Sequence, residues 1–162
     1  MLGRRAGSAS GGFTIIEILI VVVILGLLAA IVMTLFGDSR EEARQIAFIS
    51  DVEIFGNAAR VYWVRTGEHV AAADAGVVPV GWESYIDHRK WQRTTPIGGA
   101  WDTELDTFGV KSALGVDFAN GGGEDQDDTY MSEVDSRFDD GDLATGRFRR
   151  LAPGRYYFIL MP

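Results

Sequence analysis

Apolar residues are concentrated near the start of the chain, where residues 13–36 contain a single charged side chain, Glu17. Ile18 to Leu25 is an unbroken aliphatic run. A bilayer core about 30 Å thick is crossed by roughly 20 helical residues that rise about 1.5 Å each. The segment 13–36 is therefore predicted to be a transmembrane helix. A cleaved secretory signal fits less well, because its apolar core usually spans about 7–15 residues.

After this segment, apolar residues recur at the spacing of an amphipathic helix, which is predicted to continue over 37–66 and to end before Gly67. Two apolar stripes run along it. The large stripe comprises Phe48, Val52, Phe55, Ala59 and Tyr62, and the small stripe comprises Ala43, Ile46, Ala47, Ile54, Ala58 and Val61. We expect the large stripe to pack on the protein's own head and the small stripe to contact neighbouring copies. The alternative is that both stripes belong to one intramolecular core.

The rest of the chain, residues 67–162, is predicted to form a globular head made of short elements. Alternating apolar residues indicate strands, and helical spacing indicates one helix and one short helix or turn. The strands are expected at 101–108, 110–118, 146–151 and 155–161, the helix at 127–138, and the short helix or turn within 84–93. The predicted fold class is α+β, with a long N-terminal helix packed on a small antiparallel sheet.

Charge is distributed as unevenly as hydrophobicity. The 162 residues include 15 Lys and Arg against 23 Asp and Glu, a net charge of -8. Residues 1–12 carry Arg4 and Arg5 and no acid, whereas residues 67–162 carry 17 acids and 9 bases. This balance argues against a generic nucleic-acid binder, which needs a basic surface. The chain has no cysteine, which excludes disulfide scaffolds, thiolate zinc sites and cysteine nucleophiles.

Glu17 is the residue that a plain membrane anchor does not explain. A carboxylate inside a membrane helix costs about 2.5–3.5 kcal/mol on insertion scales, and such residues are usually paired and functional. No base lies one helical turn away, at 13, 14, 20 or 21. Cleavage between Gly12 and Phe13 would create an α-amino group four residues before Glu17. This amine could pair with the carboxylate of the same chain or of a staggered neighbour.

The run from Gly12 to Glu17 (GFTIIE), followed by the long aliphatic segment, resembles the N-terminal signature of type IV pilins and type II secretion pseudopilins. The resemblance implies that a prepilin peptidase cuts after Gly12 and that the new N-terminus, Phe13, is methylated. It also implies that Glu17 guides the addition of subunits to a growing filament. The segment 1–12 would then be a cytoplasmic leader peptide, in agreement with its two arginines and the positive-inside rule.

The same resemblance implies a single-pass protein of the inner membrane, with a periplasmic or extracytoplasmic head and a filament outside that membrane after assembly. The implied partners are membrane lipid, prepilin peptidase, an inner-membrane assembly platform and other subunits of a homo-oligomeric or co-pilin filament. Nucleic acid is not an expected partner, and the chain is expected to be an enzyme substrate and not an enzyme. The lack of cysteines departs from pilins that close a C-terminal loop with a disulfide, which favours a pseudopilin.

Two other functional classes stay open. The acidic head could be a membrane-anchored binding or adhesion module, which needs no polymer. It could also be an anchored hydrolase, although no paired-acid pattern supports that chemistry. Size in solution separates a polymer from a module, and activity of the isolated head would be required for a hydrolase.

Acidic residues near the end of the predicted helix 127–138 form a candidate calcium site, since hard cations bind clustered oxygens. They are Asp135, Asp139, Asp140 and Asp142. Their spacing does not match an EF-hand loop, and the alternative is a helix end followed by a solvated acidic turn. No other cofactor is indicated. An earlier acidic group at 124–128 is interpreted as charge at a helix N-terminus. Arg147, Arg149 and Arg150 are interpreted as the guard of an edge strand.

Overall fold

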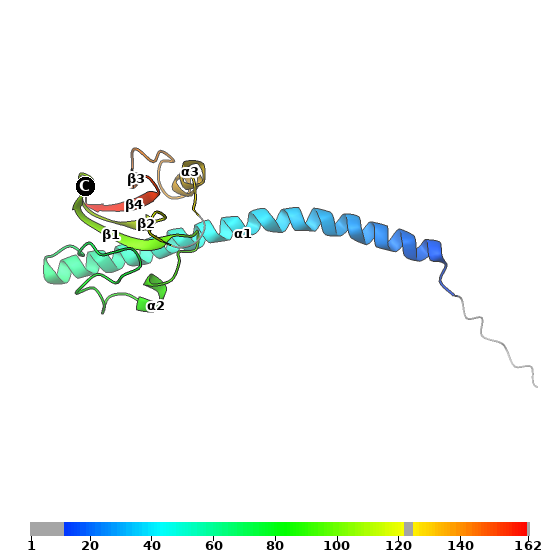
Figure 1. Ribbon diagram of the computed structural model, residues 1–162, viewed down its shortest axis with the longest axis horizontal. Helices are drawn as coiled ribbons and strands as arrows, with labels where there is room; N and C mark the ends of the chain where they lie inside the picture. Colours follow the sequence, from blue (N-terminus) through cyan, green and yellow to red (C-terminus); the bar gives the residue numbers. More distant parts are fainter. Residues whose placement is uncertain (1–11, 122–124, 162) are drawn as a thin grey trace, which may run out of the picture. The chain divides into compact units, whose positions relative to one another are not determined.

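The computed structural model describes residues 12–121 and 125–161, with the side chains of all of these except 33–38. Most of the predicted leader peptide and Glu124 lie outside the described residues. The elements are α1 (Ile15–Thr66), α2 (His88–Trp91), β1 (Ala100–Thr107), β2 (Val110–Asp117), α3 (Asp128–Ser136), β3 (Phe148–Ala152) and β4 (Arg155–Met161) (Figure 1). This order confirms the predicted α+β class. The chain divides into two compact units, residues 1–41 and 42–162.

In the first unit, helix α1 exposes apolar side chains all around its axis. The segment Ile15–Val32 is long and apolar enough to cross a membrane, and none of it is buried within the protein. Ile15 is 90% exposed and Leu27 is 63% exposed. A helix that is apolar on every side needs an apolar environment, which a bilayer or a bundle of similar helices supplies. This agrees with the predicted single membrane-spanning helix.

Helix α1 ends at Thr66, next to the glycine that the sequence marks as a stop. Gly67 has a φ of 76°, a left-handed conformation that glycine adopts without steric cost. Its N–H donates to the carbonyl of Trp63 at 2.8 Å, and the Thr66 hydroxyl donates to the carbonyl of Tyr62 at 2.9 Å. These bonds satisfy carbonyls that the end of a helix would otherwise leave unpaired.

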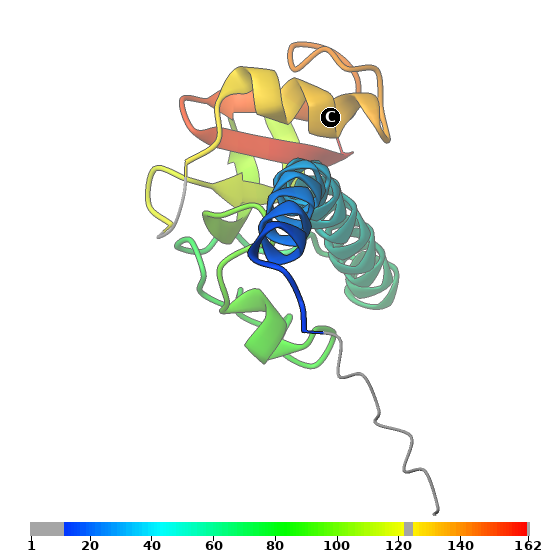
Figure 2. The ribbon, with the colours of Figure 1, turned by 90° about the vertical axis from the view of Figure 1, so that its right-hand side faces the viewer.

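The second unit contains a four-stranded antiparallel sheet with strand order β1-β2-β4-β3. The two predicted hairpins are present, and they turn at Gly109 and Gly154, which have φ values of 76° and 69°. Helix α3 lies in the connection between the hairpins, beside β3 and β4 (Figure 2). The strands begin and end within about two residues of their predicted positions, because alternation of apolar residues sets them.

The large stripe of α1 forms the centre of the head core, as predicted. Phe48, Val52 and Phe55 are at most 1% exposed. The ring of Phe48 stacks on Trp101 with centroids 5.4 Å apart, and Phe55 meets Trp101 edge-on at 5.0 Å. These are the favoured geometries of aromatic pairs. The sheet therefore lies along this part of α1 (Figure 1).

The small stripe is turned away from that core. Ile46, Ile54 and Val61 are 54%, 51% and 46% exposed, and of the six residues only Ala58 is half-buried. The alternative that both stripes serve one intramolecular core is therefore wrong. An apolar stripe that remains exposed in a single copy is a typical contact surface for another molecule.

Candidate functional site

Reciprocal hydrogen bonds between Thr14 and Glu17 cap the N-terminal end of α1. Glu17 Oε2 accepts from the backbone N–H and from the hydroxyl of Thr14, both at 2.9 Å. The Glu17 N–H donates to Thr14 Oγ1 at 3.3 Å. This is a capping box, in which the residue before a helix and the third helical residue satisfy each other's backbone donors. The Glu17 carboxylate is thereby held against the backbone at the first turn.

A search for basic partners of Glu17 misses this interaction, although the Thr-x-x-Glu spacing is its sequence signal. The two Thr14 donors satisfy part of the hydrogen-bonding capacity of the carboxylate. They bring no positive charge, so the membrane cost of an ionised group stays only partly compensated. The case for a cationic partner of Glu17 therefore still holds.

Gly12 and Phe13, between which cleavage is predicted, precede the cap and are not helical. Phe13 is 81% exposed, and Gly12 is exposed as well. A protease binds its substrate in an extended form, so a non-helical and exposed bond is suitable for cleavage. The bond lies outside the hydrogen-bonded part of the helix.

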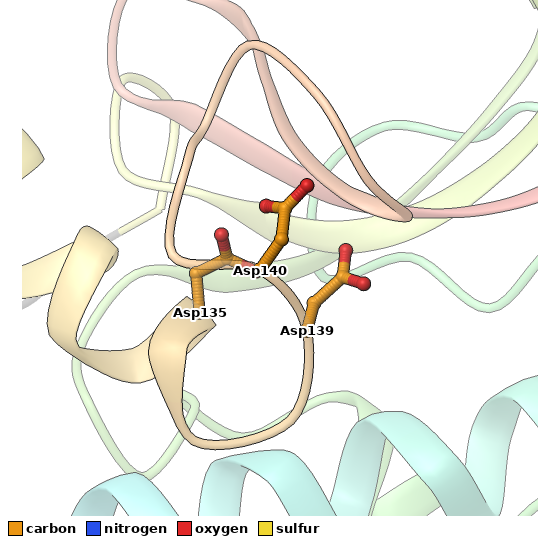
Figure 3. A group of neighbouring side chains, drawn as sticks. All are labelled: Asp135, Asp139 and Asp140. Atoms are coloured by element: carbon orange, nitrogen blue, oxygen red, sulfur yellow. The ribbon is translucent and has the colours of Figure 1, made fainter.

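In the head, Asp135, Asp139 and Asp140 come together where α3 ends and the loop to β3 begins (Figure 3). One carboxylate oxygen of each lies within 4.8 Å of those of the other two. Asp142, the fourth residue of the predicted site, is not brought into this group. Its Oδ1 accepts from the N–H of Ala144 at 3.0 Å and closes a local turn.

Asp139 and Asp140 also shape the loop that leads to β3. Asp139 Oδ2 accepts from the N–H of Phe148 at 2.9 Å and from that of Arg147. Asp140 Oδ2 accepts from the hydroxyl of Thr145 at 2.8 Å. Hydrogen bonds from short acidic side chains to nearby backbone are a common way to order a turn. These two residues therefore have a structural role whether or not a ligand is bound.

Asp135 is different, because it is fully buried and neither of its carboxylate oxygens has a hydrogen bond of normal geometry within the described residues. Burial, followed by the negative charges of Asp139 and Asp140, raises the pKa of Asp135 to about 6. The nearby backbone N–H of Gly141 lowers this pKa by a smaller amount. Most buried polar side-chain atoms in proteins are hydrogen-bonded, so an orphaned carboxylate demands an explanation.

A second polar cluster lies on the face of the sheet opposite to the large stripe. Asp102 pairs with Gly115 on the next strand, and Gly115 pairs with Tyr157 on the strand beyond. The Tyr157 hydroxyl crosses over Gly115 and donates to Asp102 Oδ2 at 2.6 Å. A Cβ on Gly115 would lie 2.6 Å from the Cα of Tyr157, which is too close for any side chain. Glycine at this position therefore permits the two strands to approach.

Arg155 is the cation of this cluster. It contacts Glu104 at 3.0 Å and Asp117 at 2.8 Å, two buried carboxylates that share one guanidinium. Burial raises the pKa of Asp102 to about 6; the Tyr157 hydrogen bond opposes this shift and the Glu104 charge adds to it. Asp102, Glu104 and Arg155 line a polar pocket of about 420 Å³. Acids at alternate positions of an antiparallel strand usually face solvent, so sequence alone did not indicate the cluster.

The three arginines that were predicted to guard an edge strand each contact another group of the protein. Arg150 contacts Asp128 at 2.6 Å, Arg149 donates to a backbone carbonyl at 2.7 Å, and the Arg147 guanidinium lies 4.2 Å from the centre of the Phe158 ring. Strand β3 is an edge of the sheet. These contacts agree with arginines that guard an edge strand.

Comparison with known proteins places the N-terminal region in a defined class, the prokaryotic N-terminal methylation motif, whose family profile matches residues 7–33. That motif is the signature of type IV pilins and pseudopilins. The chain thus carries the mark of a type IV pilin-like or pseudopilin subunit, a class that prepilin peptidase processes. The matched residues include the capping box and the apolar helix but no part of the head. Neither the curated proteins nor the solved structures give a match.

Proposed function

We propose that the chain is a structural subunit of a type IV pilus-like filament or of a type II secretion pseudopilus. Prepilin peptidase cuts between Gly12 and Phe13, Phe13 is N-methylated, and the subunit polymerises from the inner membrane through an assembly platform. In this proposal the chain is a substrate of enzymes and performs no catalysis of its own. The observation that carries the proposal is the methylation motif, with Glu17 held at the start of an apolar helix.

Glu17 is positioned for pairing with the amine that cleavage creates. Its carboxylate lies 2.9 Å from the backbone nitrogen of Thr14, and the new amine would be on the preceding residue, Phe13. The same carboxylate can meet the Phe13 amine of a neighbouring copy. Pairing of the two charges lowers the cost of holding each in hydrocarbon. Polymerisation thereby becomes the state in which the charge of Glu17 is best compensated.

The apolar surfaces of the chain support the same proposal. The segment Ile15–Val32 is exposed on all sides, and the small stripe continues along the part of α1 that carries the head. Neighbouring copies that pack their helices together would bury both. The N-terminus would be cytoplasmic and the head periplasmic or extracytoplasmic, as the two arginines of the leader favour. The absence of cysteine favours the pseudopilus over the pilus.

Processing is tested by intact-mass spectrometry of the chain isolated from cells with active prepilin peptidase. We expect a mature chain that begins at Phe13 and carries one added methyl group. A chain that still begins at Met1 in those cells would contradict the proposal.

Assembly is tested by two variants of Glu17. Glu17→Gln keeps an acceptor for the capping box and removes the charge, whereas Glu17→Ala removes both. We expect both variants to insert and to be cleaved. We expect the equilibrium constant for subunit addition to fall at least about tenfold, equivalent to about 1.4 kcal/mol, so that the filament yield drops. Glu68→Gln, at an exposed loop position, is the control and should assemble normally.

If Glu17→Gln assembles normally while Glu17→Ala does not, the cap matters and the charge does not, which overturns the role given to Glu17. The alternative function, a membrane-anchored binding or adhesion module, predicts no filaments from the wild-type chain and a discrete size in detergent. Filaments from the wild-type chain therefore separate the two functions.

A further inference from the structure

A cavity of about 170 Å³ opens beside the part of α1 that carries the head. Helix α1 contributes Ala59 and Trp63 to its lining, the segment after α1 contributes His69, and β4 contributes Leu160 and Met161. The lining is mostly apolar. A cavity of about 150 Å³ is large enough to hold a benzene ring, so this one can accept a single aromatic side chain.

The wall and the rim of the cavity indicate what kind of side chain fits. The rings of Trp63 and His69 stack with centroids 6.2 Å apart, and Trp63 remains 43% exposed. An aromatic surface is therefore accessible to a further ring. Arg60 also lines the cavity and is exposed, and it forms no ion pair with an acid among the described residues. The cavity thus suits an aromatic side chain that has a carboxylate nearby.

The turn between β1 and β2 carries such a side chain. Phe108 and Gly109 connect the paired residues Thr107 and Val110, and their φ values are 51° and 76°. A two-residue turn with positive φ at both positions favours Asn-Gly. A bulky side chain in this conformation is strained. Even so, the first position of the turn is a phenylalanine, and it is 47% exposed.

Phe108 is therefore unfavourable for an isolated copy, both because its backbone is strained and because its ring contacts solvent. Strained conformations of this kind are concentrated at functional positions. Asp106, two residues earlier, pairs with Lys111 at 2.7 Å but keeps 62% of its side chain exposed, so a second cation can reach it. The tip of the hairpin presents a ring with a carboxylate nearby, which complements the cavity.

The tip and the cavity lie at the same end of the sheet. Ser112 lines the cavity and pairs with Met161, and Phe108 lies four residues before Ser112, past the start of β2. The C-terminus, which follows Met161, lies at the end of the head where α1 ends (Figure 1). The tip thus projects past the cavity of its own copy. A neighbour displaced along the strands by this short step would bring its Phe108 level with the cavity.

We propose that the Phe108 ring of one copy inserts into the cavity between α1 and β4 of the next copy, with Asp106 near Arg60. Each copy gives one tip and receives one, a contact between two different surfaces that repeats into an open chain. The cavity adjoins the small stripe, because Ala59 follows Ala58 on α1. This inference rests on the filament function proposed above, and it specifies which surfaces of the head meet.

Phe108→Asn separates assembly from folding, because Asn is the favoured residue at this turn position. We expect the Tm of the full-length chain in detergent, followed by tryptophan fluorescence, to rise by at least about 2 °C. In cells, the ratio of subunit in sheared filaments to subunit left in the membrane should fall at least about tenfold. Phe108→Tyr keeps the ring and should assemble normally. So should Val80→Asn, at an apolar loop position that is 82% exposed.

Cysteine pairs locate the contact, since the chain has no cysteine of its own. A disulfide forms only between residues whose Cα atoms lie within about 7 Å. Thr107→Cys beside the ring, combined with Met161→Cys at the cavity, should give a ladder of disulfide-linked multimers under mild oxidation of membranes and filaments. Val80→Cys combined with Met161→Cys is the control and should give no ladder. Addition of Phe108→Asn to the first pair should suppress its ladder.

Wild-type filaments without a ladder from the first pair, or normal assembly of Phe108→Asn, would overturn the docking of the ring and leave the filament function in place. A ladder in membranes of cells that make no filaments would support the docking and contradict the filament function. Absence of both would overturn both proposals. A lower Tm for Phe108→Asn would also count against the docking, because lost assembly would then follow from a damaged head.

Discussion

Replacement of Asp102 by Asn tests the energetic cost of the buried polar cluster behind the sheet. In the folded chain the pKa of Asp102 is raised from 3.8 to about 6, mainly by burial. The protonated form is therefore favoured in the folded state. Protonated Asp102 therefore contributes to the free energy of unfolding. This contribution is fully present below the unfolded pKa of 3.8 and is lost as pH rises through about 6. A shift of this size corresponds to about 3 kcal/mol.

Asn is neutral at every pH, so Asp102→Asn does not incur that loss. We expect the free energy of unfolding of the variant, relative to wild type, to rise by about 2 kcal/mol between pH 4 and pH 7, because part of the full difference is already present at pH 4. The assay is urea unfolding of the segment 42–162, the unit that contains every buried core residue among those the structure describes. Trp82, Trp91 and Trp101 are buried and provide the fluorescence signal.

Asp106→Asn is the matched control. Asp106 lies on the same strand, but its side chain is 62% exposed and pairs with Lys111 at 2.7 Å. Its effect should stay within about 0.5 kcal/mol at every pH. Parallel pH profiles for wild type and Asp102→Asn would refute the reasoning, because burial would then carry no penalty. A relative loss of stability in the variant at pH 7 would show that attraction to Arg155 outweighs burial.

Phe55 is 1% exposed and packs among tryptophan rings. Phe55→Ala should therefore lower the free energy of unfolding, measured in urea, by about 3–5 kcal/mol. The control Val64→Ala, at a position that is 71% exposed, should lower it by only about 0.5 kcal/mol. A loss below about 1 kcal/mol would contradict the assigned core. Gly115→Ala should cost about 1–3 kcal/mol, since its Cβ would overlap the backbone of Tyr157. Gly56→Ala should instead stabilise the protein by about 0.5–1 kcal/mol, because its Cβ would meet Leu160 at an ordinary contact distance of 3.7 Å. If Gly115→Ala and Gly56→Ala changed the free energy of unfolding equally, the steric explanation would be refuted.

Local periodicity explains what could be predicted from the sequence. The bounds of α1 and of the four strands follow from helical and alternating patterns with glycine at the turns, and these signals act over a few residues. The large stripe was identifiable as the core face because Phe48 and Phe55 are seven residues apart. The capping box was also readable, since Thr14 and Glu17 have the required spacing.

The polar cluster around Asp102 could not be predicted from the sequence, because it depends on which strands become neighbours. Asp102 meets Tyr157 only because β4 pairs with β2, a contact between residues 55 positions apart. Sequence separation of this kind leaves no local pattern. Asp135 is an intermediate case: its spacing from Met131 and Val134 places it on the buried face of α3. Its lack of partners appears only once the loop to β3 is in place.

The capping box has a consequence for maturation. Its hydrogen bonds involve Thr14 and Glu17, and neither Gly12 nor Phe13 takes part in them. Removal of a leader at the predicted bond would therefore leave the first turn intact, with no unwinding before the cut and no renucleation of the helix after it. The chain would lose the leader and gain an α-amino group on Phe13, while the first helical turn keeps its conformation. The energetic cost of nucleating a helix, which is high, would therefore be met only once, before the cut.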